Sequence, residues 1–294
     1  MADITVNLVL LQIVTGIALG AVYALLAVGL SLIFGMLNVV NFAHGAFFMV
    51  GAFLGVYFQA ATGSFVLSLL VTPLVVGGLG LLVERFLIRP LYGRGIDYPL
   101  LLTFGLSYVL VEAMRVLFGI EGLPSSTPAA LRGAVDLGFG YFPLYRLFLI
   151  AATAVIVLAL WFFIEKTRYG LIIRAGSRDP EIVRVLGIDV ARIWLVVFAI
   201  GTAIAGLSGV LAAPTRAVNP EMGIAVLGES FVVTVVGGMG SLPGAVVAGL
   251  LVGVVFSLSS LFFPDLAELS IYVLMAVVLL VRPQGLFGKP GAMG

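Results

Sequence analysis

The sequence predicts an all-α polytopic membrane protein with eight or nine transmembrane helices, formed by residues 1–294 as a single transmembrane domain. Hydrophobic residues make up 62% of the 294 residues and charged residues only 10%, and the mean hydropathy is +1.25. A soluble domain carries about 25% charged residues, so the low charge points to lipid. Four Gly-x-x-x-Gly patterns favour closely packed helices. They lie at Gly16/Gly20, Gly51/Gly55, Gly240/Gly244 and Gly249/Gly253.

Long apolar runs divide the chain, and about 20 such residues are needed to cross a bilayer as a helix. Six full-length runs come first, and two short runs then flank one more full-length run. The runs cover residues 6–34, 42–61, 65–83, 100–118, 144–164, 193–213, 224–236, 245–263 and 269–281. Whether the short run before Gly237 is a ninth crossing or a re-entrant segment stays open.

Basic residues indicate the orientation, because cytoplasmic loops of membrane proteins carry an excess of Lys and Arg. Eleven of the fifteen basic residues lie in three segments, at 85–94, 165–192 and 282–289. Nine crossings put all three segments on one side, whereas eight crossings would move one end. We therefore expect a cytoplasmic C-terminus and an N-terminus outside. The N-terminus lacks a basic region, so the first run is expected to act as an uncleaved signal.

Several kinds of chemistry are not expected. The chain has no cysteine and one histidine, which argues against disulfides, thiolate chemistry and a zinc site. His44 has no carboxylate nearby in sequence, so no catalytic constellation is indicated. The phosphate-binding pattern Gly-x-x-x-x-Gly-Lys-[Ser/Thr] does not occur, so the chain is not expected to bind ATP by that route.

The most distinctive polar stretch covers residues 165–192, between two apolar runs, and holds six of the fifteen basic residues. Within it Asp179 suits a helix N-cap, Pro180 the first helical position and Glu181 the positive end of the helix dipole. Three apolar side chains would share one face of this helix, namely Ile182, Val185 and Leu186. A short amphipathic helix in a cytoplasmic loop suggests a docking element for a soluble partner.

A second polar segment, residues 38–45, joins the first two apolar runs without any charged residue. Asn38, Asn41 and His44 therefore lie at or inside the bilayer, where polar groups need partners or water. One interpretation is that these side chains line a solute path or a gate. The other is a helix-capping turn with Asn41 as the N-cap of the next helix. The two interpretations are compatible.

Residues 237–244 contain four glycines and a proline, a composition that a regular helix does not tolerate. Such backbone is accepted at membrane depth only when it is buried in protein or lines water. The segment is therefore either a discontinuous helix on a translocation path or a tight cytoplasmic turn. On the first interpretation the path residues are Gly237, Gly238, Gly240 and Ser241.

Four blocks of the sequence resemble the branched-chain amino-acid permeases of ATP-binding-cassette (ABC) uptake systems, the LivH-type inner-membrane subunits. They occur in family order across nearly the whole chain. The blocks are GLSLIFGMLNVVNFAHG at 29–45, RAGSRDPEIVRVLGI at 174–188, VGGMGSLPGA at 236–245 and RPQGLFG at 282–288.

The resemblance implies a permease of a bacterial-type inner membrane that works with a second homologous permease, two cytoplasmic ATP-binding subunits and an extracytoplasmic solute-binding protein. ATP would be used by the partner subunits, and no cofactor of this chain and no nucleic acid is expected. The solute would be leucine, isoleucine or valine, or a related small amino acid or amide. Residues 179–187 would form the helix that couples to an ATPase subunit. The coupling residues would be Arg174, Arg178, Asp179, Pro180, Glu181, Leu186 and Gly187.

The alternative from another class is an ion-coupled secondary transporter. Such a protein would be expected to hold carboxylates in the middle of the membrane. The candidates are Glu112 and Glu229, and both are expected near the ends of apolar runs. Glu112 is also expected to pair with Arg115, three residues further along the same helix.

Overall fold

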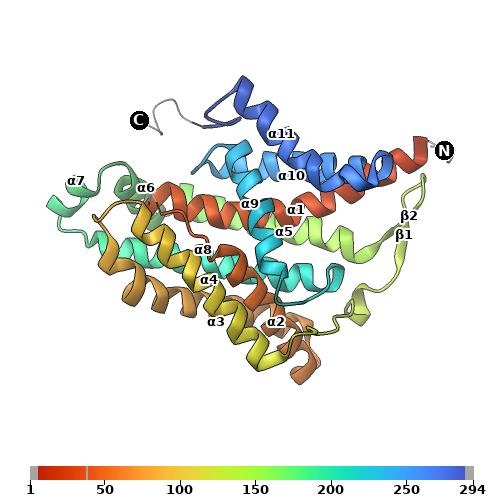
Figure 1. The fold of residues 1–294 in the computed structure, drawn as a ribbon, viewed down its shortest axis with the longest axis horizontal. Coiled ribbons are helices and arrows are strands. Elements are labelled where there is room, and N and C mark those ends of the chain that lie inside the picture. The colour runs from red at the N-terminus through yellow and green to blue at the C-terminus, as the bar shows by residue number, and fades with distance from the viewer. Residues whose placement is uncertain (1–5, 38, 289–294) are drawn as a thin grey trace. The chain divides into compact units, whose positions relative to one another are not determined.

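The structure is a computed structural model and describes residues 6–37 and 39–288 (Figure 1). Almost all regular structure in these ranges is helical, which confirms the predicted all-α class. The α-helices are α1 (Val6–Leu37), α2 (His44–Thr62), α3 (Phe65–Val83), α4 (Asp97–Phe118), α5 (Leu144–Lys166), α6 (Arg168–Arg178), α7 (Pro180–Val185), α8 (Val190–Ala212), α9 (Met222–Gly237), α10 (Leu242–Phe262) and α11 (Ala267–Val281). A π-helical turn η1 (Glu84–Ile88) and a 3-10 turn η2 (Arg89–Leu91) follow α3.

Eight helices in the described ranges are long and apolar enough to cross a membrane. The eighth is α11 together with the 3-10 turn that precedes it, Pro264–Val281. The remaining apolar helix, α9, has 16 residues and is therefore about 24 Å long, against a hydrocarbon core of about 30 Å. These helices reproduce all nine apolar runs of the sequence.

By density of contacts the chain divides into two units. Unit 1 combines Met1–Ala27, Thr127–Ile156 and Glu229–Gly294, and unit 2 combines Val28–Ser126 and Val157–Gly228.

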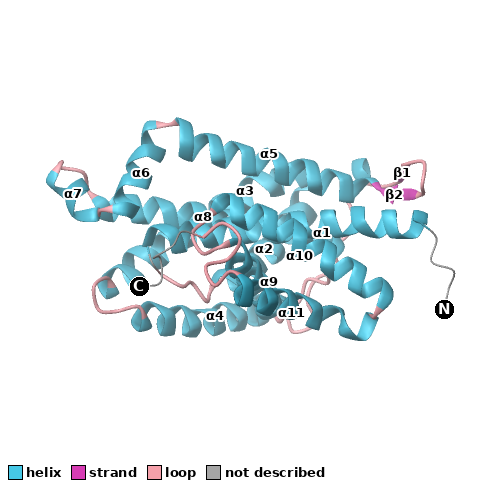
Figure 2. Ribbon diagram, turned by 90° about the horizontal axis from the view of Figure 1, so that it is seen from above, coloured by secondary structure: helices cyan, strands magenta, loops and turns pink. Residues whose placement is uncertain are grey.

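Unit 2 is built on α2, α3 and α8, which pack against one another (Figures 1 and 2). Their close approach depends on glycines at the points where the helices cross. A Cβ atom added to Gly51 of α2 would lie 2.2 Å from the carbonyl oxygen of Gly206 on α8. On α3, a Cβ atom at Gly80 would lie 2.0 Å from the Thr202 hydroxyl. Lipid provides no hydrophobic driving force between helices, so close packing through small residues stabilises such crossings instead.

In unit 1, the first part of α1 packs against α10 through two of the predicted Gly-x-x-x-Gly patterns. A Cβ atom at Gly20 would lie 2.7 Å from the carbonyl oxygen of Gly249, and one at Gly253 would lie 2.4 Å from the carbonyl oxygen of Gly16. Gln12 and Ser257 add two reciprocal hydrogen bonds between side chain and backbone, both 2.7 Å long.

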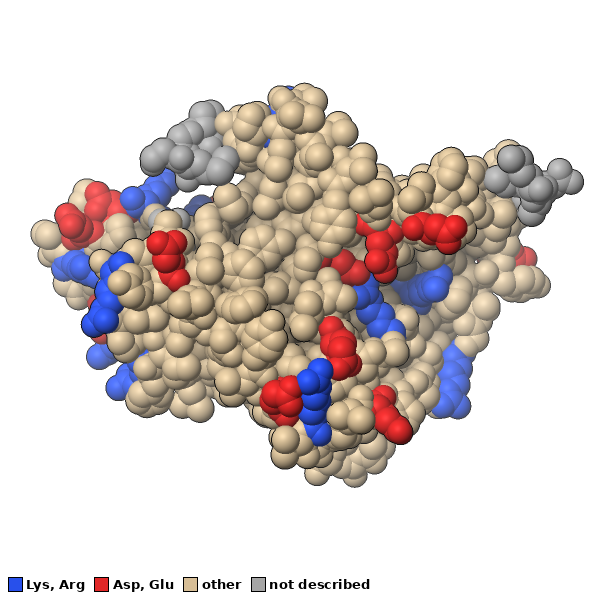
Figure 3. Space-filling model, in the orientation of Figure 1, with Lys and Arg blue, Asp and Glu red and all other residues tan. Residues whose placement is uncertain are grey.

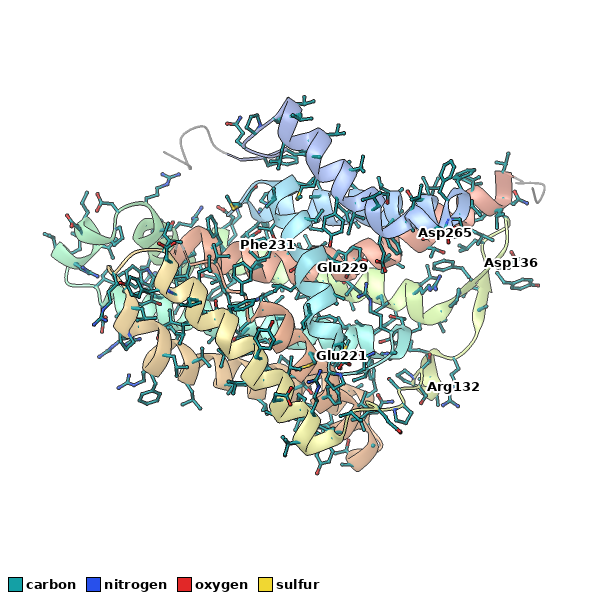
Figure 4. All side chains as sticks on the ribbon, viewed as in Figure 1. Arg132, Asp136, Glu221, Glu229, Phe231 and Asp265 are labelled. Atoms are coloured by element: carbon teal, nitrogen blue, oxygen red, sulfur yellow. The ribbon has the colours of Figure 1, made fainter. Side chains whose placement is uncertain are left out.

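A small antiparallel hairpin, β1 (Ala134–Asp136) and β2 (Tyr141–Pro143), lies in the connection before α5, and the sequence did not predict it. Asp136 accepts a hydrogen bond from the Gly138 backbone N–H at 2.8 Å, which stabilises the turn (Figure 4).

Candidate functional site

Residues 165–192 form the end of α5, the helices α6 and α7, and the start of α8 (Figure 2). Thr167 caps α6 by accepting a hydrogen bond from the Gly170 N–H at 3.1 Å. Arg174 of α6 forms an ion pair with Glu165 at the end of α5. Arg178 is the last residue of α6. The separate helix α6 was not predicted, because its signals lie in a stretch interpreted as a loop.

The predicted short helix is α7, and its start signals are confirmed. Asp179 is the N-cap, and its Oδ1 accepts hydrogen bonds from the N–H groups of Glu181 and Ile182 at 3.1 and 3.0 Å. Pro180 occupies the first helical position. Asp179 is also the C-cap of α6, so a single residue sets the angle between the two helices.

The C-terminal end of α7 requires a glycine at position 187. The Gly187 N–H donates to the Arg184 carbonyl at 2.9 Å and the Ile188 N–H donates to the Val183 carbonyl at 3.3 Å, the pattern of a Schellman motif. The motif requires a left-handed residue after the C-cap Leu186, and Gly187 has φ +79°. Glycine adopts this conformation without the cost that a Cβ atom adds.

The apolar face of α7 points to solvent. Ile182, Val185 and Leu186 are 60%, 88% and 71% exposed, whereas Val183 on the opposite face is 3% exposed. Charged side chains of both signs surround this end of the molecule (Figure 3). Large apolar side chains held outward on a folded helix and rimmed by charge mark an interaction surface.

The polar segment before α2 is fully buried. Asn41 and His44 have no exposed surface, and Asn38 lies outside the described residues. The expected cap is wrong in its position, because α2 has Ala43 as its N-cap residue. Asn41 Oδ1 instead accepts from the Ala43 N–H at 3.1 Å, which stabilises the turn before the helix. Asn41 Nδ2 has no hydrogen-bond partner among the described residues.

This segment lies beside the middle of α8. A Cβ atom on Gly29 of α1 would meet the His44 ring at 3.3 Å and the Gly201 carbonyl oxygen at 2.9 Å, and Gly201 lies halfway along α8. Thr103 of α4 fixes the segment from another side. Its Oγ1 accepts from the Phe42 N–H at 3.1 Å. A break between two helices thus places buried polar groups level with the middle of a membrane-spanning helix.

Residues 237–241 form a tight turn between α9 and α10. Gly237 ends α9, and Gly238 and Gly240 have φ +98° and +79°. Ser241 caps α10 by accepting a hydrogen bond from the Gly244 N–H at 3.2 Å. The segment is thus a turn between two helices and not part of a regular helix, as its composition predicts.

The C-terminal tail packs onto this turn through backbone groups. The Leu286 N–H donates to the Val236 carbonyl at 2.8 Å, and the Phe287 N–H donates to the Gly237 carbonyl at 3.0 Å. A Cβ atom on Gly238 would lie 2.4 Å from the Gly288 nitrogen. The sequence contains both glycine-rich motifs, but nothing in it indicates that they touch.

Gly238→Ala is therefore expected to destabilise the protein more than Gly63→Ala. Both glycines have positive φ, but no atom lies within 4 Å of a Cβ added to Gly63. Gly63→Ala should cost about 1 kcal/mol for the backbone alone. Gly238→Ala should add about 2 kcal/mol, because the tail must move away. Thermal unfolding in mild detergent measures both variants, and equal shifts would contradict the importance of the tail contact.

Two expectations about charged residues have different outcomes. Arg115 pairs with Glu112 as predicted, and it also donates to Glu221 at 2.8 Å, which was not predicted. That hydrogen bond lowers the pKa of the Glu221 carboxyl.

Glu229 was expected near the membrane interface, but it is half-buried in the middle of α9 (Figure 4). The expected end position does not hold, because Glu229 lies near the middle both of the apolar run at 224–236 and of α9.

Eight candidate spans, a buried polar break beside the middle of α8 and a short helix with an exposed apolar face are the features of a membrane transport protein. Residues 12–281 match the family described as the permease component of the branched-chain amino acid transport system, and the chain belongs to this family.

Curated relatives extend the match over nearly the whole chain. It is 31% identical over 299 residues to the high-affinity branched-chain amino acid transport system permease protein BraD of Pseudomonas aeruginosa, covering 95% of both chains. It is 30% identical to the LivH permease protein of that system in Escherichia coli, again with 95% coverage of both. The E. coli permease protein LivM is 27% identical, covering 90% of this chain and 67% of LivM. Because the chain belongs to this family, its role is transport. The same membership disfavours the alternative of an ion-coupled secondary transporter.

Proposed function

We propose that the chain is the membrane-spanning permease subunit of an ATP-driven ABC importer. Its solute is leucine, isoleucine or valine, or a related small amino acid or amide. The family match over residues 12–281 carries the proposal, and the exposed apolar face of α7 supports the need for a soluble subunit.

The complete transporter on this proposal contains a second homologous permease, two cytoplasmic ATP-binding subunits and an extracytoplasmic solute-binding protein. Similarity to both LivH and LivM, two permease proteins named for one system, supports the pairing of homologous permeases. The subunits that bind ATP hydrolyse it, and this chain needs no cofactor and performs no catalysis. It lies in a bacterial-type inner membrane with the C-terminus in the cytoplasm, as the basic segments favour.

Residues of the α6–α7 region form the proposed coupling site to the ATPase. Ion-paired Arg174 holds α6 against α5, Asp179 and Pro180 start α7, and Gly187 ends it. Leu186 lies on the exposed apolar face, and Glu181 and Arg178 are charged groups beside it. The fixed ends allow a six-residue helix to keep its shape while its apolar face binds another protein.

Among the proposed path residues, Asn41 and His44 are supported by their complete burial and by their place beside the middle of α8. A buried amide N–H with no partner among the described atoms fits a group that meets water or solute. Asn38 stays in this proposal from the sequence alone. Gly237, Gly238, Gly240 and Ser241 at the turn after α9 likewise stay in this proposal from the sequence alone.

His44→Ala is expected to reduce uptake less than Gly244→Leu. A Cβ atom on Gly244 would lie 2.1 Å from the Gly237 carbonyl oxygen, so leucine must open the turn. Alanine at position 44 leaves the backbone of α2 intact. Solute uptake per amount of membrane-inserted protein measures both variants. The reverse order would identify His44 as a direct solute contact.

The proposal is tested by purifying the tagged chain from its native membranes in mild detergent and identifying the proteins that remain bound. An ATPase and a second permease are the expected partners. The complex in proteoliposomes should then take up labelled leucine when the ATPase is supplied with ATP, with urea and short amides as competing solutes. A chain that arrives alone, or with copies of itself, would contradict the proposal.

A further inference from the structure

A buried polar cluster lies where α3 ends, close to α7. Glu84 at the start of η1 has no exposed surface. Its carboxylate accepts a hydrogen bond from Arg89 Nη2 at 3.0 Å and another from the Tyr92 hydroxyl at 3.0 Å. Burial, followed by the charge of Glu84, raises the pKa of Tyr92 above its usual range, so the hydroxyl remains a donor. Buried carboxylates require such partners, and π-helical turns such as η1 often occur at functional sites.

The cluster also contacts the start of α8. Arg89 Nη2 donates to the Ala191 carbonyl at 3.0 Å. The ring of Tyr92 meets the indole of Trp194 edge to face, with centroids 4.7 Å apart. The turn after α3 and the first turns of α8 are therefore joined by one hydrogen bond and one aromatic contact.

From Trp194 the contacts continue to α7. The Arg184 guanidinium lies over the indole ring, 5.9 Å from its centroid. A cation over an indole face is attracted by the ring quadrupole. An open cleft of about 590 Å³ lies beside this contact. Its lining includes Tyr92, Arg178, Asp179, Glu181, Arg184 and Trp194.

A helix as short as α7 is not stable by itself and depends on tertiary contacts. The contact to Trp194 is thus one of few that fix its position, since most of its side chains are exposed. α3 and α8 lead from the cluster to the polar segment. Gly77 and Gly80 of α3 pack on α8, Gly201 of α8 lies beside Gly29 of α1, and the His44 ring also lies beside Gly29. Closely packed helices of this kind move as rigid elements.

We propose that Tyr92 and Trp194, anchored on Glu84, are positioning residues that tie α7 to the packed helices α3 and α8. A displacement of α7 by its partner then reaches the buried segment at 40–44 through rigid helices, and the aromatic pair decides how much of that displacement is passed on. This inference rests on the proposed function, because it requires an ATP-driven partner on α7.

The chain supplies a matched control for this proposal, because its other tryptophan makes the same kind of contact elsewhere. Trp161 on α5 has the Lys166 ammonium 5.7 Å from its ring centroid. No edge-to-face partner in the described chain links Trp161 to α7. Trp161→Ala therefore removes an indole and a cation–π contact without touching the proposed connection.

The experiment uses the complete transporter in proteoliposomes and measures solute transported per ATP hydrolysed. Trp194→Ala should retain ATPase binding and hydrolysis but lower this ratio about tenfold, the size of a typical coupling free energy. Trp194→Phe should restore most of the ratio, because it keeps an aromatic face between Tyr92 and Arg184. Trp161→Ala should match the wild type. Tyr92→Phe removes only the hydrogen bond from the hydroxyl to Glu84 and should lower the ratio by a smaller factor. This variant tests the proposal if the Trp194→Ala complex does not assemble.

A wild-type ratio in Trp194→Ala, or in Tyr92→Phe where Trp194→Ala does not assemble, would overturn the inference. An equal loss in Trp161→Ala would also overturn it. Failure of the proposed function has a different signature, because the wild-type complex itself would then show no ATP-dependent uptake.

Discussion

Gly51→Leu is expected to remove the folded protein from the membrane. A Cβ atom at this position would lie 2.2 Å from the Gly206 carbonyl oxygen and 2.4 Å from its Cα atom. Both are backbone atoms, so no side-chain rotation relieves the clash and α2 must move away from α8. Overpacking of this kind costs about 3 kcal/mol, and lipid gives the separated helices no hydrophobic force to return.

The measurement is the amount of protein in the membrane fraction, followed by gel filtration in mild detergent. Gly78→Leu on α3 is the matched control, because no atom lies within 4 Å of a Cβ added there. It should insert and elute like the wild type. A monodisperse Gly51→Leu variant at wild-type yield would show that the α2–α8 crossing is not as close as described.

Val185→Asp is expected to abolish ATPase binding and uptake while leaving the fold intact. The side chain is 88% exposed in the isolated chain, so an aspartate there meets only water until a partner binds. In the complex it would bury a carboxylate in an apolar contact, at a cost of several kcal/mol. One such loss at an interface hot spot weakens association at least about thirtyfold.

Co-purification of the ATPase subunit and thermal unfolding of the variant together check this prediction. The control is Val135→Asp, which places the same charge on the β1 strand at a side chain that is 40% exposed. It should bind the ATPase normally. Normal ATPase binding by Val185→Asp would remove the apolar face of α7 from the coupling site.

The parts of the structure that were predictable rest on local signals. The helical spans follow from runs of apolar residues, and α7 follows from Asp179 and Pro180 at its start. What the sequence did not indicate is irregular local backbone and contacts between residues far apart in the chain. The contacts of Glu84 with Arg89 and Tyr92 depend on a π-helical turn, and the pairing of Arg115 with Glu221 joins positions 106 residues apart. Hydrophobic periodicity carries no information on such contacts.

The two errors in detail have different causes. Asn41 has the residue type of an N-cap, but Thr103 of α4 holds the chain so that the helix begins at His44 instead. Glu229 was simply misplaced, because it lies near the middle both of the apolar run at 224–236 and of α9. For Asn41, tertiary packing and not local preference decides where the helix begins.

The contact of the tail with the α9–α10 turn also sets an order of assembly during synthesis. Leu286 and Phe287 supply two of the backbone donors at that turn, and they are translated after α11. The turn between α9 and α10 therefore lacks these two hydrogen bonds until the segment beyond α11 has been synthesised. The end of α9 is completed only after α10 and α11 have been made.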